Sequence, residues 1–168
     1  ADNNTAVGMS ALTANTTGTR NVAVGCGALA SNVDDNDNTA IGFDALTVNT
    51  GQNNTALGTC ALRGNQTAND NTGIGMRSLF TNTTGASNTG LGFSSLKANT
   101  TGPYNVAVGN KALEANTTGE QNTAIGRVAL NSNIAGICNT AVGHNALNSN
   151  LCCFNTAVGN EALRLNTT

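Results

Sequence analysis

A unit of 17 residues repeats along the whole chain, and this period limits the folds that the chain can adopt. Each of ten copies opens with Asn, and successive opening residues are 17 apart except for two steps of 16. A short fixed period of this kind is typical of a solenoid, in which each copy forms one coil of a stack. The opening residues are Asn4, Asn21, Asn38, Asn54, Asn71, Asn88, Asn105, Asn122, Asn139 and Asn155.

Numbered from its Asn, each copy has Asn at position 1, Gly at position 5, Leu at position 9 and Asn at position 12. Such frequent Asn and Gly leave no room for a helix of useful length. Short β segments such as 140–142 and 146–147, separated by Asn and Gly corners, fit the unit better. We therefore predict an all-β protein. We expect residues 1–168 to form a single β-solenoid domain, a β-roll of ten coils about 48 Å long with uncapped ends.

The invariant positions predict the interior. A leucine column in water would be an aggregation hazard, so it should line the core. It consists of Leu12, Leu29, Leu46, Leu62, Leu79, Leu96, Leu113, Leu130, Leu147 and Leu163. The Asn residues at positions 1 and 12 should form ladders, each amide bonding its copy one coil away and capping corner backbone groups. The position 12 ladder is Asn15, Asn32, Asn49, Asn65, Asn82, Asn99, Asn116, Asn133 and Asn150.

The side chains at positions 2 to 4 can be arranged in two ways, because strand side chains alternate between the two faces of a sheet. Position 2 is Thr in eight copies, position 3 is Ala or Gly, and position 4 is Val, Ile or Leu. In the favoured arrangement positions 2 and 4 point inward, and the small residues form a flat outer stripe for lateral contacts. In the alternative the Ala points inward, and a ridge of Thr and aliphatic residues runs along the outside.

Composition argues against several classes of function. Net charge is −2, and the seven basic residues are scattered, so a nucleic-acid partner is not expected. No apolar run is long enough to span a bilayer. The only histidine, His144, occupies a variable position, and no nucleophile, base and orienting group recur together. We expect no enzyme activity and no cofactor.

Acidic, cysteine and sequon residues give the remaining candidate sites. Asp34, Asp35 and Asp37 form the only acidic cluster, for which a solvated loop is preferred and a Ca²⁺ site is the alternative. Since Arg20 precedes Asp37 by one coil, an ion pair between them is expected.

Stacking should bring Cys138 close to Cys153 or Cys152 as a disulfide, with Cys26 and Cys60 free or paired between chains. The sequons of Asn3 and Asn53 lie outside the ladders and are the accessible glycosylation candidates.

The two ends of the chain keep the phase of the repeat. Three residues precede Asn4, and the last copy stops at its fourteenth position, so together they complete one period. Solenoids that end in this way, without polar caps, are expected to stack head to tail into filaments. The alternative is a fragment of a longer repeat protein. The predicted end-to-end interface is Ala1, Asp2, Asn3, Asn166, Thr167 and Thr168.

The unit Asn-Thr-Ala-Val-Gly-x-x-Ala-Leu-x-x-Asn-Thr-Thr-Gly, as in residues 4–18, resembles repeats of phage and algal-virus tail-fibre-like proteins. It is also similar to the head repeats of trimeric autotransporter adhesins. The resemblance implies an extracellular fibre, often trimeric, on a cell or virion surface, with itself and a surface or glycan as partners. A structural or adhesive fibre subunit is the first hypothesis. The second is an ice-binding protein, which requires the Thr column to point outward.

Overall fold

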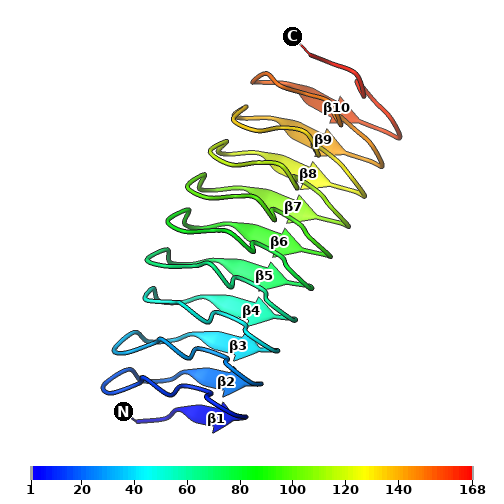
Figure 1. Ribbon diagram of the computed structural model, residues 1–168. Helices are drawn as coiled ribbons and strands as arrows, with labels where there is room; N and C mark the ends of the chain where they lie inside the picture. The colour runs from blue at the N-terminus through cyan, green and yellow to red at the C-terminus, as the bar shows by residue number, and fades with distance from the viewer. Residues whose placement is uncertain (1, 168) are drawn as a thin grey trace.

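The computed structural model describes residues 2–167 and forms a single β-solenoid (Figure 1). Each coil contributes one short strand, and the strands lie side by side in chain order in one parallel sheet. The strands are β1 (Thr5–Val7), β2 (Val22–Val24), β3 (Thr39–Ile41), β4 (Thr55–Leu57), β5 (Thr72–Ile74), β6 (Thr89–Leu91), β7 (Val106–Val108), β8 (Thr123–Ile125), β9 (Thr140–Val142) and β10 (Thr156–Val158). The predicted fold class is confirmed.

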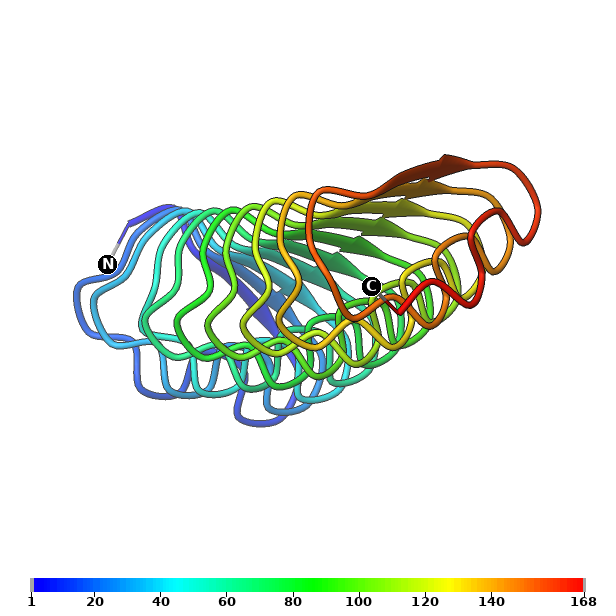
Figure 2. The same ribbon diagram turned by 90° about the horizontal axis from the view of Figure 1, so that it is seen from above.

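Neighbouring strands pair position for position, so each residue stacks on its counterpart in the next coil. In β7 and β8, for example, Val106 faces Thr123 and Val108 faces Ile125. Viewed along the rod, the strands occupy one long side of every coil, and the rest of the coil returns on the other side (Figure 2). Strands β1 and β10 lie at opposite ends of the rod (Figure 1).

Only one of the two predicted β segments per coil exists. The stretch at 146–147 lies in consecutive turns, and this part of the prediction was wrong. The physical reason is the backbone of the leucine column, where φ is 49–51° at every Leu. This left-handed conformation costs a non-glycine residue roughly 1–2 kcal/mol, and it turns the chain so that the side chain enters the interior. Burial of the Leu side chain, worth about 1.5–3 kcal/mol, offsets that cost.

The core consists of the Leu column and of the small residues at positions 3 and 8. Leu29 to Leu147 of the column are fully buried, Leu12 is 9% exposed, and Leu163 in the last coil is 53% exposed. Ala at position 3 is also buried, as at Ala23, Ala40 and Ala124. The favoured arrangement, in which the side chains at positions 2 and 4 point inward, was therefore wrong. A coil this narrow has no room for a second aliphatic column beside Leu, so the small residue points inward and the bulky one outward.

Two ladders of asparagine hold the coils in register, as predicted. At position 1, the Asn88 side-chain oxygen accepts a 2.8 Å bond from the Asn105 backbone N–H, while its amide donates to the Gly102 carbonyl oxygen at 2.9 Å. At position 12, the Asn99 amide donates to the Asn82 side-chain oxygen at 2.8 Å and to the Gly102 carbonyl at 2.9 Å. These side chains are buried, and they satisfy corner backbone groups that water cannot reach.

The glycine column ends each strand. At Gly109 φ is 134°, and a Cβ there would lie 2.6 Å from the carbonyl oxygen of Gly126. Only glycine fits both the conformation and the close approach of the next coil. The sharp corner that follows carries the variable positions 6 and 7, which are therefore presented at the edge of the sheet.

Candidate functional site

The outer face of the sheet is a regular surface that runs along the whole rod. It carries two parallel columns, the position 2 residues, mostly Thr, and the position 4 residues Val, Ile and Leu. Several of the aliphatic side chains are well exposed, including Val7 at 58%, Leu57 at 44%, Leu91 at 43% and Ile125 at 41%. Neither column contains a charged residue. The ridge of Thr and aliphatic side chains is therefore an uncharged, largely apolar surface along the rod.

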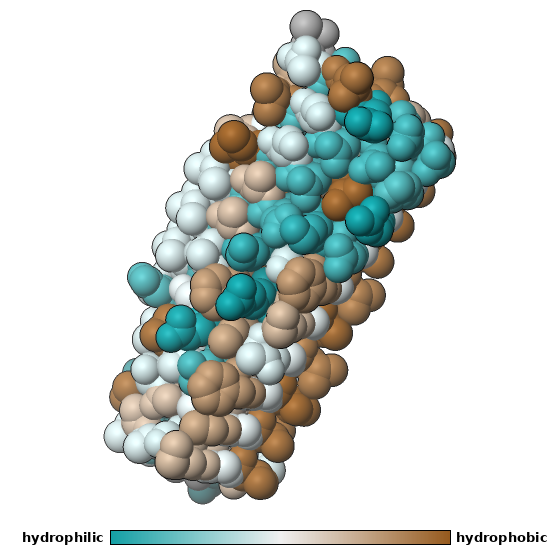
Figure 3. Space-filling view, turned by 45° about the vertical axis from the view of Figure 1, so that its right-hand side comes forward, coloured by the Kyte–Doolittle hydropathy of each residue, from teal (hydrophilic) through white to brown (hydrophobic). Residues whose placement is uncertain are grey.

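Strand geometry fixes the spacing of this surface. Successive coils place equivalent side chains about 4.8 Å apart along the rod, and positions 2 and 4 of one strand are about 6.6 Å apart across it. Because strand pairing is in register throughout, the same two spacings recur over ten strands. In the space-filling view, apolar side chains follow one margin of the rod over much of its length (Figure 3).

The type of residue at position 6, directly after the Gly corner, differs between the N-terminal and C-terminal parts of the rod. In the first six coils it is mostly apolar, with Met9 at 74%, Phe43 at 52%, Met76 at 44% and Phe93 at 38% exposure. In the last four coils it is Asn110, Arg127, His144 and Asn160. Hydrophilic side chains accordingly gather over the C-terminal coils (Figure 3). The apolar surface of the sheet is thus widened only in the N-terminal part.

The histidine lies in a row of contacts along this polar part. An Arg127 guanidinium nitrogen is 3.0 Å from His144 Nε2, and His144 Nδ1 is 3.1 Å from the Asn160 side-chain oxygen. All three side chains are exposed. Polar residues of three successive coils thus form an exposed row of contacts, unlike the two Asn ladders, which are buried.

The acidic cluster is dominated by an ion pair, as predicted. The Arg20 guanidinium makes two hydrogen bonds to the Asp37 carboxylate, of 2.6 and 2.7 Å, and these hold the pKa of Asp37 below its usual value. Partial burial, with the neighbouring Asp34 charge, raises the pKa of Asp35. In residues 2–167, no group of three or more His, Cys, Asp or Glu side chains is arranged to hold a metal ion.

The disulfide prediction was wrong, because all five cysteines are free thiols. The second 16-residue coil changes the register, so that the Phe154 backbone N–H bonds the Ile137 carbonyl and Phe154 lies opposite Cys138. Cys153 lies opposite Ile137 and accepts that residue's backbone N–H at 3.3 Å. Cys153 therefore stacks on Ile137, and Phe154 takes the place beside Cys138 that a bonded cysteine would need. Cys152 is exposed, and Cys26 and Cys60 are half-buried.

The other predicted sites are spread along the rod. The sequon residues Asn3 and Asn53 are exposed, with φ of 62° and 58°. Of the predicted end-to-end interface, Ala1 and Thr168 lie outside the described residues, and the other members lie at opposite ends. Residues 2–167 contain no helix long and apolar enough to cross a membrane.

Comparison of the chain with protein-family models, with curated proteins and with solved structures finds no match.

Proposed function

We propose that the chain is a structural and adhesive fibre module, extracellular, whose rods pack side by side through the outer face of the sheet. The observation that carries this proposal is the unbroken outward column of Val, Ile and Leu at position 4. Monomeric proteins rarely expose a continuous apolar surface over their whole length, and such surfaces mark interfaces. Similarity of the repeat to fibre and adhesin repeats supports the same function.

The ridge suits a second copy of the chain. Ten coils and a three-residue strand give a face of about 48 by 10 Å, and the position 6 side chains of the N-terminal coils widen it. Specific interfaces bury about 800 Å² per partner, so association is expected to use the ridge and the apolar position 6 residues together. The uniform period lets every coil of one rod meet an equivalent coil of the next.

Analytical ultracentrifugation tests the proposal. The double substitution Leu91→Glu and Ile125→Glu places two charges on the ridge and should leave the protein monomeric at concentrations where the unaltered chain associates. Asn110→Glu with Arg127→Glu, on exposed position 6 of the polar part, is the matched control and should associate normally. A monomeric unaltered chain at high concentration would contradict the proposal.

Ice binding is the second candidate, and the outward Thr column favours it. With positions 2 and 4 pointing inward these hydroxyls would have been hidden, whereas the observed arrangement presents eight threonines and two valines in one outward column. A regular array of methyl and hydroxyl groups on a stiff sheet is suited to ordering water at an ice surface. Thermal hysteresis of the monomer is the measurement, and Thr72→Tyr with Thr89→Tyr should abolish it. If the solution shows no thermal hysteresis, ice binding is ruled out and the fibre proposal is the one that remains.

A further inference from the structure

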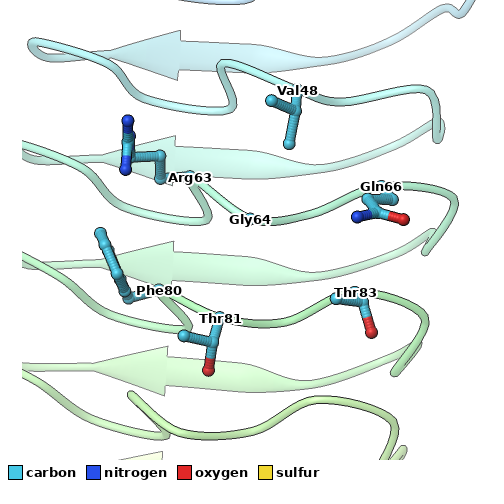
Figure 4. A pocket seen from close by; sticks show the side chains of 7 residues that line it. All are labelled: Val48, Arg63, Gly64, Gln66, Phe80, Thr81 and Thr83. Atoms are coloured by element: carbon cyan, nitrogen blue, oxygen red, sulfur yellow. The ribbon is translucent and has the colours of Figure 1, made fainter.

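A hollow interrupts the face opposite the sheet, in the coils that contain β3, β4 and β5. It encloses about 350 Å³ and is open to solvent. Figure 4 shows Gly64 at its centre, Val48 and Thr81 in the coils on either side, Arg63 and Phe80 at one end, and Gln66 and Thr83 at the other. Its size is at the lower limit of ligand sites, which are roughly 300–1,000 Å³.

Several departures from the repeat meet at this hollow. Gly64 is the only glycine at position 11, Phe80 the only aromatic residue at position 10, and Gln66 the only amide at position 13. The coil that begins at Asn38 is also one residue short, and its loop lies beside Gln66, whose carbonyl accepts the Thr50 N–H. Three side chains that each occur once at their repeat position therefore meet in one place, and function resides in local sites added to a regular fold.

One end of the hollow is cationic. The Arg63 and Arg77 guanidinium carbons lie 5.9 and 5.8 Å from the centre of the Phe80 ring. Arg63 also makes a 3.5 Å ion pair with Asp44, whereas Arg77 has no ion pair among the described residues. The side chain of Arg63 is 48% exposed, so part of its guanidinium remains open to a ligand. Arginine in this setting binds carboxylates through paired N–H groups.

The other end supplies neutral hydrogen-bonding groups. The exposed side-chain amide of Gln66 makes no hydrogen bond within the described part of the chain, and it offers both a donor and an acceptor. The Thr83 hydroxyl donates to the Thr100 carbonyl at 3.0 Å, so its oxygen remains available as an acceptor. Between the two ends lie the Val48 side chain and the bare backbone of Gly64.

We propose that this hollow binds one carboxylated sugar unit of an acidic glycan. The carboxylate would meet Arg63, the ring would lie over Gly64 against Val48 and the Phe80 side chain, and the ring hydroxyls would meet Gln66 and Thr83. A neutral sugar lacks the group that the cationic end recognises. The site deepens the adhesive part of the proposed function, on which it rests, but it lies on the face opposite the ridge. Loss of sugar binding and loss of self-association are therefore measured separately.

The test is calorimetric titration of the full chain with trigalacturonic acid and, for comparison, neutral maltotriose. The acidic trisaccharide should bind at least about tenfold more tightly, which corresponds to about 1.4 kcal/mol. Arg63→Gln and Phe80→Ala should each weaken binding about tenfold or more. Gln66→Ala, which breaks no ion pair, should weaken it severalfold. Circular dichroism establishes that each variant is folded.

The matched controls are Arg164→Gln, at the same repeat position as Arg63, and Phe93→Ala, an exposed aromatic residue outside the hollow. Both should bind trigalacturonic acid like the unaltered chain. Three results would overturn the proposal: no binding by the folded unaltered chain, equal binding of the neutral trisaccharide, or equal loss in the control variants. Self-association, followed in parallel by ultracentrifugation, should be unchanged in every hollow variant.

Discussion

The hydroxyl of Ser78 donates a 2.9 Å hydrogen bond to the carbonyl oxygen of Gly90 inside the solenoid. Ser78 and Ser95 replace the usual Ala at position 8, their hydroxyl oxygens are 2.9 Å apart, and both coils have Gly instead of Ala at position 3. A Cβ at Gly90 would lie 2.5 Å from Ser78 Oγ and 3.0 Å from Ser95 Oγ. The smaller residue on the strand thus makes room for the larger residue across the core.

This relationship predicts a strongly non-additive pair of changes. Gly90→Ala alone should lower the free energy of unfolding by about 1–3 kcal/mol, because it overpacks a closed interior. In a Ser78→Ala, Ser95→Ala background the same change should be neutral or stabilising, since it restores the composition of the other coils. Urea unfolding of the four proteins gives the coupling energy. Additive effects would show that the serines do not set the space at Gly90.

The position 1 ladder should make a large contribution to stability. Asn88→Ala removes the acceptor of the Asn105 N–H and the donor to the Gly102 carbonyl, and leaves both buried without these partners. We expect a loss of about 2–4 kcal/mol in the free energy of unfolding, measured in urea. Asn110→Ala, at an exposed position without side-chain hydrogen bonds to the described residues, is the control and should change stability by less than about 0.5 kcal/mol. Equal losses would remove the ladder as a source of stability.

The backbone at position 7 offers a stabilising substitution. Val128 has φ of 53°, which is unfavourable for a β-branched residue, while Asn145 occupies the same position in the next coil at 57°. Val128→Asn should therefore raise the free energy of unfolding by about 0.5–1 kcal/mol, with a higher melting temperature. Val128→Thr keeps the β-branch and should bring no gain. An Asn variant no more stable than the Thr variant would contradict this account.

The carboxyl group of Asp35 should make stability depend on pH. Partial burial raises its pKa, and Oδ2 is a buried atom without a hydrogen-bond partner among residues 2–167. A raised carboxyl pKa favours the folded state below the unfolded value of 3.8 and loses that contribution as pH rises through the folded pKa. Asp35→Ala introduces the residue that Ala68 already supplies at the same repeat position. It should stabilise the protein at pH 7 by up to about 1 kcal/mol, because solvent screens this half-buried group.

Thermal melts between pH 3 and pH 7 measure the effect. The difference between Asp35→Ala and the unaltered chain should grow as pH rises and should be smallest at pH 3. The control is Asp70→Ala, at an exposed carboxylate of the loop two coils further on. A pH-independent difference for Asp35→Ala would indicate that charge burial is not the cause.

The sequence by itself determined the solenoid, its period, the Leu core and both Asn ladders. These follow from repetition inside one chain: a residue that recurs at one phase meets its own copy in the next coil. An apolar column such as Leu113 must then be buried, and a buried amide such as Asn88 must bond its neighbours. The ion pair between Arg20 and Asp37 follows from the same phase argument, since both are at position 17.

The tertiary structure alone decided the facing of the strands, the path of the turns and the two candidate surfaces. Because strand side chains alternate, either position 3 or positions 2 and 4 could point inward. The narrow coil, whose width is set by Leu113 in a left-handed conformation, selects the inward Ala at position 3. Because the second shortened coil ends one residue early, Phe154 and not Cys153 lies opposite Cys138. The hollow at Gly64 joins residues from three coils, which lie far apart in the sequence and meet only when the coils stack. Local propensity does not fix such relationships, because they depend on how neighbouring coils share space.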